Sequence, residues 1–421
     1  MKRSRAAVET TMDVLAMLRE PARLADPYPL YAELRQRPPV RLPPGEIVLS
    51  RYSDVAAVLK DPMFRKPPLP RPPSKATRVL FRMFLLLDPP DHTRLRRVVA
   101  PAFAPSAVAT LRSTATLVAD RLITSVPSTF DLVRDFAYPQ PLAVIGELLG
   151  IPDAERPKIG AWSRTLTESL DDPLPLRLRE LPRGVRSIVQ GRSHPVAAAR
   201  AAAGIVGYAK QRMGGATGEP VTEFLETLDR AQHEGVINAD EAVATWIMMV
   251  IAGHETTANL IGNSVLALLD RPDLRTRIHN DPTLMSRVVD ECLRYDSPVP
   301  YTARTATEDT TINGIRIERG QTAVVFMSAA NRDPDPFPDP DRLDLTRPQT
   351  PPHLGFASGI HFCVGSALAK LETEIALTTL LPRLSSDSHR GEVTRRPSVA
   401  VRGLAKFRIQ LAPSATTRST P

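Results

Sequence analysis

The sequence predicts a single, mostly helical domain with small β-sheets, and three observations carry that prediction. Apolar residues recur at helical spacing over much of the chain, most regularly from about Asp240 to Asp270. Strand-like alternation is confined to short stretches. Prolines, 42 in 421 residues, gather in short clusters that indicate connectors, and none is long enough to separate two domains.

Each expected element follows from its own local pattern. Helices are predicted where apolar residues repeat at helical spacing, often with Asp, Ser or Pro near the start. These segments are 53–61, 92–103, 106–126, 139–149, 195–213, 221–231 and 240–270. Strands are predicted over 40–51, 310–326 and 406–411, and proline-rich connectors over 38–44, 67–73 and 333–348.

The helix over 240–270 is apolar around much of its circumference, which is typical of a helix buried in the middle of a molecule. At its centre Ala252, Glu255, Thr256 and Asn259 share one face. A buried carboxylate is costly unless it is hydrogen-bonded or functional. The residues alone leave both interpretations open: a satisfied polar pair, with Thr256 bonded to a carbonyl one turn back, or a functional site.

The two cysteines, Cys292 and Cys363, exclude a disulfide framework and argue against a four-ligand zinc or iron–sulfur site. Cys363 lies in the loop FASGIHFCVG (356–365), directly before the expected helix SALAKLETEIALTTLLPRL. The helix N-terminus is expected to lower the pKa of this thiol, and Gly359 and Gly365 to let the backbone approach a flat surface. An inert, buried cysteine is the commoner alternative for a lone Cys.

Charge and hydropathy narrow the class of protein. The net charge is +8, but the basic residues are scattered among acids, so an acidic protein partner is a better expectation than nucleic acid. The sequence contains no run of about 18 apolar residues, so it predicts no membrane span. The basic N-terminus has no sustained apolar core and no cleavage site, so the sequence predicts a cytoplasmic protein.

The pattern Phe356-x-x-Gly359-x-His361-x-Cys363-x-Gly365 resembles the haem-binding loop of cytochromes P450. Four further stretches resemble motifs of that family in its order, and the resemblance extends from residue 26 to the last strands. They are LDPPDHTRLRR (87–97), Ala252-Gly253-x-Glu255-Thr256-Thr257, Glu291-x-x-Arg294 and NRDPDPFPDPDRLDLTR (331–347). The chain departs from the family at Ala357, where the family usually has Gly. An alanine allows fewer backbone conformations at this position than a glycine does.

This resemblance implies a single-domain P450 fold with haem b between the long central helix and the cysteine loop. It places the catalytic domain at 26–412, after a partly flexible N-terminal extension (1–25) and before a C-terminal tail (413–421). It implies that Cys363 binds the iron as a thiolate, which favours O–O cleavage. Phe356, Gly359 and Gly365 would shape the loop that shields and tunes the sulfur.

The resemblance also implies roles for polar residues. His92, Arg96, Arg304 and His361 would hold the haem propionates. Ala252 and Gly253 would let the long helix open for dioxygen, and Glu255 and Thr256 would relay protons to it. Glu291, Arg294 and Arg342 would form a buried charge cluster behind the cysteine loop.

Other residues carry weaker expectations. Met248, Ala252 and Val299 would contact substrate, within a pocket bounded by 64–87, a suggested mobile lid, and by residues near 160–200. Cys292 is expected to be a packed core residue, and His254 to lie beside the catalytic face.

The expected function is insertion of one atom of dioxygen into an organic small molecule, in secondary metabolism. Electrons would come from NAD(P)H through ferredoxin reductase and ferredoxin. Arg94, Arg97 and Lys370 are candidate contacts for an acidic ferredoxin, and the protein is expected to be a monomer that binds neither nucleic acid nor membrane. Oxidative coupling or desaturation is an alternative reaction, and a haem protein that binds a ligand without turnover is an alternative of another class.

Overall fold

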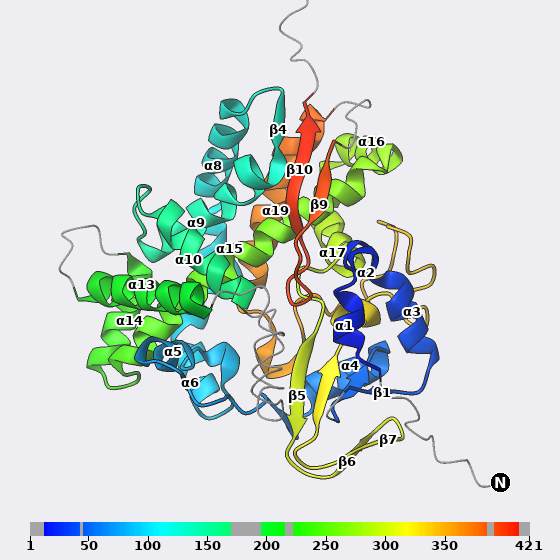
Figure 1. Ribbon diagram of the computed structural model, residues 1–421. Helices are drawn as coiled ribbons and strands as arrows, with labels where there is room; N and C mark the ends of the chain where they lie inside the picture. Colours follow the sequence, from blue (N-terminus) through cyan, green and yellow to red (C-terminus); the bar gives the residue numbers. More distant parts are fainter. Residues whose placement is uncertain (1–11, 43–44, 170–194, 215–221, 385–390, 412–421) are drawn as a thin grey trace, which may run out of the picture.

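The long helix α15 (Ala239–Leu269) runs through the middle of the molecule (Figure 1). The protein is described by a computed structural model over residues 12–42, 45–169, 195–214, 222–384 and 391–411. Helix α15 begins at a capping box, in which Asn238 accepts from the amide of Glu241 and the Glu241 carboxylate accepts from the amide of Asn238. Pro272, the first residue of the next helix, follows its end at Asp270.

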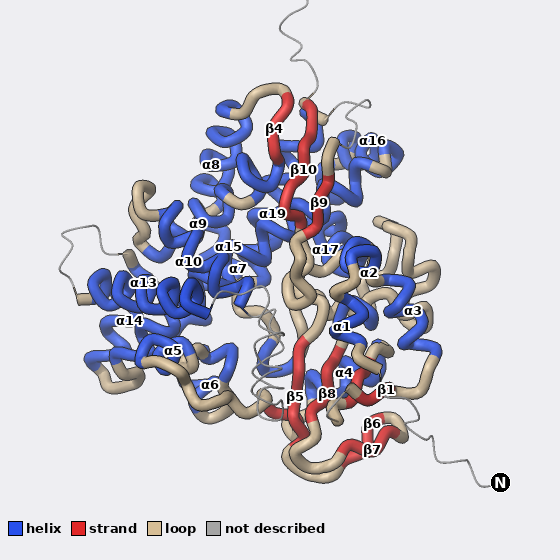
Figure 2. Tube along the Cα trace, viewed as in Figure 1, coloured by secondary structure: helices blue, strands red, loops and turns tan. Residues whose placement is uncertain are grey.

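Helices surround α15 on the side away from the larger sheet (Figure 2). Those in contact with it include α9, α10, α13, α17 and α19. The longer helices are α3 (Tyr28–Gln36), α4 (Tyr52–Lys60), α6 (Asp91–Val99), α8 (Arg112–Ser125), α9 (Pro139–Leu149), α10 (Arg156–Ser169), α13 (Pro195–Met213), α14 (Glu223–His233), α16 (Pro272–Asn280), α17 (Met285–Tyr295) and α19 (Ser366–Leu380). Shorter ones are α1 (Val14–Leu18), α2 (Pro21–Ala25), α5 (Lys75–Leu80), α7 (Pro105–Thr110) and α18 (Met327–Ala330).

The strands form three small sheets. The five-stranded sheet has the order β1 (Val40–Arg41), β2 (Ile47–Leu49), β8 (Thr322–Val325), β5 (Thr302–Ala306), β3 (Phe64–Arg65), with β2 and β8 parallel and the other pairs antiparallel. The second sheet has the order β4 (Thr129–Asp131), β10 (Leu404–Gln410), β9 (Val393–Arg395). The third is the hairpin β6 (Thr310–Ile312) and β7 (Ile315–Ile317).

The predicted fold class, mainly helical with small sheets, is confirmed. Two predicted helices are divided: 92–103 into α6 and a 3-10 turn over Ala100–Phe103, and 106–126 into α7 and α8. Strand β5 was not predicted, because TARTA has no strict alternation and its burial depends on β3 and β8.

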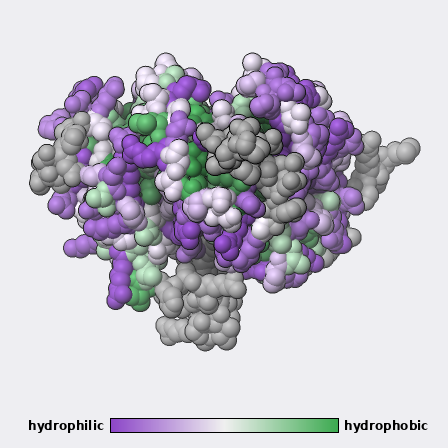
Figure 3. Space-filling model, turned by 90° about the horizontal axis from the view of Figure 1, so that it is seen from above, coloured by the Kyte–Doolittle hydropathy of each residue, from purple (hydrophilic) through white to green (hydrophobic). Residues whose placement is uncertain are grey.

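Three hydrophobic clusters form the core, the largest of them around α15. Val14, Leu15 and Leu18 of α1 are buried with Leu30 and Tyr31 of α3, so α1 packs with the predicted catalytic domain although it precedes residue 26. No helix within the described ranges is both long and apolar enough to cross a membrane. Seen from above, the surface is mostly hydrophilic, with hydrophobic residues gathered near the middle of this face (Figure 3).

Candidate active site

Helix α15 loses its burial close to its middle. Ala252 is exposed and Gly253 and Thr256 are partly exposed, whereas the turns on both sides are buried. A buried helix shows small, open residues at its centre only if it borders an internal space there. The Thr256 hydroxyl donates to the Ala252 carbonyl at 2.9 Å, which is the local bond expected of a satisfied threonine, yet its side chain remains at the edge of this space.

The helix is not interrupted at Gly253, contrary to the expectation that it would open there. It is α-helical over its full length from Ala239 to Leu269. A Cβ at Gly253 would lie 3.0 Å from the Ile145 side chain, so glycine allows α9 to pack closely against α15.

The cysteine loop is built by glycine geometry and one backbone bond. The Cys363 amide donates to the Phe356 carbonyl at 3.0 Å, which closes the loop. Gly359 has φ +70°, and a Cβ there would collide with the Leu59 carbonyl oxygen of α4, so no other residue fits. At Gly365 the nearest atom to a Cβ is a Phe103 carbon at 3.9 Å, so the protein itself leaves room there, as a flat cofactor would require.

The pKa of Cys363 differs from the expected direction. Burial raises the pKa of this thiol overall, although the Gly365 amide and the charge of Arg96 act to lower it. The predicted effect of the helix start is therefore present but smaller than the effect of burial. A thiolate at this position needs a cation bound to the sulfur, which is what a metal ion provides.

Four of the predicted cofactor ligands lie together next to the loop. His92 is 2% exposed, and neither of its ring nitrogens has a hydrogen-bond partner among the described residues; the same holds for Nε2 of His361. The two imidazole rings are 4.4 Å apart. Arg304, also 2% exposed, donates to Thr302 and to the Ala303 carbonyl, and Arg96 lies close enough to Cys363 to feel its charge.

Buried donors without acceptors fit an anionic ligand. Burial lowers the pKa of Arg304 to about 10 and, together with the charge of Lys66, lowers the pKa of His361 to about 2. Both pKa values are lowered because the charged forms are buried next to other cations, with little negative charge nearby to stabilise them. A group with carboxylates, such as the haem with its two propionates, would remove that cost, so the residues present fit this cofactor.

Glu255 is buried, whereas Ala252 is exposed and Thr256 partly exposed, so the members of the predicted polar face have different surroundings. Its carboxylate is 1% exposed and accepts from Tyr138 Oη at 2.9 Å and from Arg396 Nη1 at 2.5 Å. Burial raises the pKa of Glu255, but the charge of Arg396 and these bonds outweigh it, so the pKa is lowered overall. Glu255 is thus held as a carboxylate.

His254 lies beside Glu255, as expected, and shares its tyrosine. Its Nε2 is 3.1 Å from Tyr138 Oη and its Nδ1 is 2.7 Å from the Val250 carbonyl. The Tyr138 hydroxyl also lies 2.9 Å from the Gly160 carbonyl. The one hydroxyl proton of Tyr138 therefore has three acceptors within reach, the Glu255 carboxylate, His254 Nε2 and the Gly160 carbonyl, and it can move from one to another.

Behind the loop, Glu291 and Arg294 of α17 form the predicted buried pair, with bonds of 2.8 Å to both carboxylate oxygens. The prediction for the third member was wrong. The side chain that joins the pair is Arg347, whose Nε is 3.4 Å from Glu291 Oε1, whereas Arg342 is exposed and supplies its backbone carbonyl to Arg294. Both arginines lie in the same irregular segment, and a sequence motif does not say which of two side chains turns inward.

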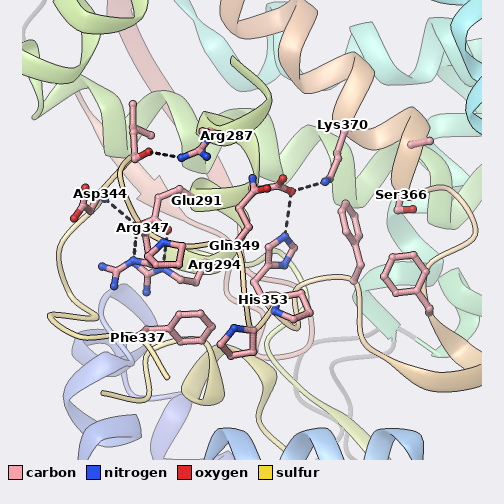
Figure 4. Close-up of a pocket in the computed structure, with 18 residues that line it drawn as sticks. Arg287, Glu291, Arg294, Phe337, Asp344, Arg347, Gln349, His353, Ser366 and Lys370 are labelled. Carbon is pink, nitrogen blue, oxygen red and sulfur yellow. Dashed lines mark hydrogen bonds and ion pairs between the residues drawn. The ribbon is translucent and has the colours of Figure 1, made fainter. Parts of the chain in front are cut away.

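A cavity of about 410 Å³ lies against this cluster and the outer side of the cysteine loop (Figure 4). Arg294 and Arg347 lie side by side next to Glu291, and Lys370 and His353 both point to Asp290. His353 also contacts Phe356, with ring centroids 5.8 Å apart. The residues around the cavity thus tie α17 and α19 to the loop that carries Cys363.

The remaining candidates have the following places. Met248 is 4% exposed and its sulfur accepts from the Leu85 amide, and Val299 packs against the smaller core cluster that contains Leu354. Cys292 is 3% exposed, and burial raises the pKa of its thiol to about 12, as befits a packed core residue. Of the predicted substrate segments, 64–87 is described, whereas 170–194 lies outside the described residues.

The three basic residues proposed for a partner differ in their surroundings. Arg94 is paired with Glu241 and Asp91, and Lys370 with Asp290. Arg97 is exposed. Arg94 and Arg97 also line a groove between α6 and α14, with Arg230 on its other wall.

Sequence reasoning missed four residues of the site. Tyr138 and Arg396 hold Glu255 from positions 117 and 141 residues away, and no local pattern relates them. Arg347 stands in a motif that was recognised, five residues from the arginine chosen. Lys66, whose charge acts on His92 and His361, directly precedes PPLPRPP, and no motif points to it.

Comparison with known proteins agrees with this geometry. Residues 218–401 match the family model described as Cytochrome P450. The chain is 37% identical over 406 residues to a vitamin D(3) 25-hydroxylase of Pseudonocardia autotrophica, covering 92% of this chain and 94% of the relative. It is 35% identical to the cytochrome P450 monooxygenase PikC of Streptomyces venezuelae, covering 92% and 91%. The structure of P450BioI in complex with hexadec-9Z-enoic acid ligated acyl carrier protein superposes with a TM-score of 0.81 at 31% identity, covering 93% and 99%.

Proposed function

Because the chain belongs to the cytochrome P450 family and is therefore a haem-thiolate monooxygenase with haem b, we propose that it hydroxylates a hydrophobic small molecule of secondary metabolism. The electrons come from NAD(P)H through ferredoxin reductase and ferredoxin. Three observations favour an apolar substrate: a relative named for vitamin D3, a neighbour that carries a fatty acyl chain, and the apolar residues around Ala252.

One observation carries the placement of the cofactor. Two segments are less buried than their surroundings: the middle of α15 at Ala252 and Thr256, and the loop from Phe356 to Gly365. The haem would fill a space between them. The ring nitrogens of His92 and Nε2 of His361, which have no hydrogen-bond partner among the described residues, would stand at its edge. We assign Cys363 as the iron ligand and His92, Arg96, Arg304 and His361 as the ligands of the propionates.

When bound, the haem supplies the activation of dioxygen. The chain's own residues supply protons and exclude water. Thr256 holds its hydroxyl proton at Oγ1 at the border of the space, where it can turn from the Ala252 carbonyl toward a bound ligand. Glu255, anchored by Arg396, and Tyr138, with its three acceptors, keep a chain of exchangeable protons behind the helix.

The assignment of Cys363 is tested by spectroscopy on the purified protein. Reduced protein under carbon monoxide should show the absorption band of thiolate-bound haem, and Cys363→Ser should abolish it. Cys292→Ser is the matched control, since it removes the other thiol and should leave the band in place. A band that survives in Cys363→Ser would show that the iron is bound elsewhere.

The substrate class is tested by ligand-induced shifts of the haem Soret band, with vitamin D3 and hexadec-9Z-enoic acid as first probes. A shift followed by NAD(P)H-dependent hydroxylation with ferredoxin and its reductase is expected for the apolar class. In Thr256→Ala, electrons should be diverted to hydrogen peroxide while the spectrum is kept. Equal hydroxylation by Thr256→Ala and the parent would contradict the role of this hydroxyl.

A further inference from the structure

Lys66 lies among the residues assigned to the propionates, although no motif pointed to it. It follows β3, which pairs with β5 so that Arg65 lies opposite Thr305, next to Arg304. Its backbone amide donates to both oxygens of Asp88 at 3.1 Å. Its ammonium group is close enough to Arg304, His92 and His361 for their charges to act on one another.

The charges of this cluster do not balance within the protein. Lys66, Arg96 and Arg304 are cations, and the carboxylate that acts on Lys66 and Arg304 within the described part of the chain is Asp88. Burial lowers the pKa of His92, which disfavours a charge on this imidazole, and the count is made of Lys66, the two arginines and Asp88. When Lys66 is protonated, three positive charges against one negative charge leave an excess of two, which equals the charge of the two haem carboxylates.

We propose that Lys66 is a third cation for the two carboxylates of the haem, beside Arg96 and Arg304. This inference rests on the proposed position of the haem against Cys363. Without Lys66, the bound haem would leave two cations, Arg96 and Arg304, against three carboxylates, namely Asp88 and the two of the haem. One of these carboxylates would then be partly buried without a compensating charge.

The pKa of Lys66 gives this role a pH dependence. In the protein alone, burial and the charge of Arg304 lower the pKa of Lys66 to about 7. Two carboxylates nearby raise it again, since an opposite charge favours the protonated amine. Below pH 7 the ammonium is charged with or without haem, so its full attraction holds the cofactor. Above pH 7 the ammonium must first bind a proton, so its contribution falls as the pH rises.

The surrounding titratable groups have to be separated from this effect. Lys66 is faced by Asp88 before α6, by His92 of α6, by Arg304 of β5 and by His361 of the cysteine loop, and Arg96 of α6 acts on the same two histidines. Haem carboxylates act on the two histidines as well. The contribution of Lys66 is therefore measured as a ratio between variant and parent at each pH, in which the contributions of the shared groups cancel.

The experiment measures the rate at which the holoprotein loses haem to excess apomyoglobin, from pH 6 to pH 9. Lys66→Met should lose haem about tenfold faster than the parent at pH 6, the loss typical of a hydrogen bond to a charged group. The ratio should shrink above pH 7. Lys66→Arg stays charged throughout, so it should match the parent at pH 6 and hold haem more firmly at pH 9. Lys75→Met removes an exposed lysine of α5 and should change nothing.

Haem dimethyl ester, exchanged into each holoprotein, distinguishes this role from a merely structural one. With its carboxylates esterified, parent and Lys66→Met should release the cofactor at the same rate. A pH-independent ratio, an equal difference with the ester, or haem loss from Lys66→Met at the parent's rate would overturn the inference. Failure of the proposed function has another signature, namely a parent protein without the thiolate band under carbon monoxide.

Discussion

Glu255 shows how a single carboxylate depends on residues far away in the sequence. It is buried on a core helix, where an isolated carboxylate would take up a proton, and yet its pKa is lowered. Arg396 supplies the compensating charge and Tyr138 supplies a hydroxyl. The carboxylate that we propose for proton delivery is therefore also part of the stability of the fold.

Removal of the guanidinium in Arg396→Leu should lower the free energy of unfolding by about 3 kcal/mol at pH 7, because a buried carboxylate is left without its cation. The pKa of Glu255 should rise. Lys406→Leu breaks the exposed pair with Glu392 and should cost much less, because water screens both charges. Urea unfolding followed by circular dichroism measures both, and equal losses would show that the Glu255–Arg396 pair contributes no more than a surface pair.

Ala357 is the one departure from the family pattern noted in the cysteine loop, and its backbone shows the consequence. Its φ of +58° lies in the left-handed region, which costs a residue with a Cβ about 1 kcal/mol or more relative to glycine. Ala357→Gly should therefore raise the free energy of unfolding by up to about 1 kcal/mol, after the entropy lost by glycine is subtracted. The same urea titration tests it, and a loss of stability would mean that the Ala357 methyl group contributes packing that outweighs the strain.

Residues of the site differ in how far the sequence predicts them, for a physical reason. Cys363, Gly359 and His361 stand within a few residues of one another, so a local pattern carries their geometry. Lys66 and Arg396 reach the site through the pairing of strands and the path of the last hairpin. Their side chains are placed by tertiary packing, which no spacing along the chain records.

At the scale of elements, the cysteine loop is held by α17 and by the irregular segment 331–347. Arg294 donates to the carbonyls of Asn331, Pro340 and Arg342, so one side chain fixes three turns of that segment. Arg347 closes it by reaching back to Glu291 and to the Pro338 carbonyl. The segment has little regular structure, and hydrogen bonds from buried arginines replace the bonds of a helix or sheet.

This arrangement distinguishes two nearby arginines. Arg347→Leu should destabilise the protein by about 2 kcal/mol or more and speed the loss of haem, because Glu291 and the carbonyls of Pro338, Asp339 and Arg342 lose a charged donor. Arg342→Leu keeps the carbonyl that the structure uses and should stay within about 0.5 kcal/mol of the parent. The opposite order, measured by urea unfolding and by haem transfer to apomyoglobin, would restore Arg342 as the third member of the cluster.

The sequence predicted well the helices whose apolar residues repeat regularly, and predicted poorly the strands whose limits depend on the strands they pair with. Helices α9, α13 and α15 agree with the predicted segments to within a residue or so at each end, because their apolar stripes are long. The predicted strand 310–326 consists of three, β6, β7 and β8, since Asn313 and Gly314 form a tight turn and Gly320 another. Local alternation cannot show where such a strand is divided between two sheets.

At the scale of the whole molecule, the C-terminal hairpin joins segments from both ends of the chain. Arg395 binds Asn263 of α15 and Asp296 after α17, and Arg402 binds Asp296 and the carbonyls of Leu24 and Ala25. Tyr28 of α3 donates to Asp296 as well. Helices α2, α3, α15 and α17 thus meet at one buried carboxylate, which lies outside the site but fixes the frame that positions it.

Asp296 should therefore control the acid stability of the molecule. Burial raises the pKa of its carboxyl, but the charges of Arg402 and Arg395 and the Tyr28 hydroxyl outweigh burial and lower the pKa far below its value in the unfolded chain. A group with a lowered pKa contributes stability that is present above the unfolded pKa of about 4 and is lost as the pH falls toward the folded value. Asp296→Asn leaves Arg395 and Arg402 without a compensating negative charge, although their other hydrogen bonds remain, and should cost about 3–5 kcal/mol at pH 7.

The difference between parent and Asp296→Asn should itself depend on pH. Between pH 7 and pH 3.5 the parent should lose about 0.7 kcal/mol through this carboxyl alone, and the variant nothing through that position, so the gap narrows by that amount. Asp273→Asn breaks an exposed pair with Arg271 and should stay within about 1 kcal/mol of the parent at both pH values. Urea titrations at the two pH values measure the gap. A constant gap would show that Asp296 has an ordinary pKa in the fold, and a gap that widens on acidification would show a raised one.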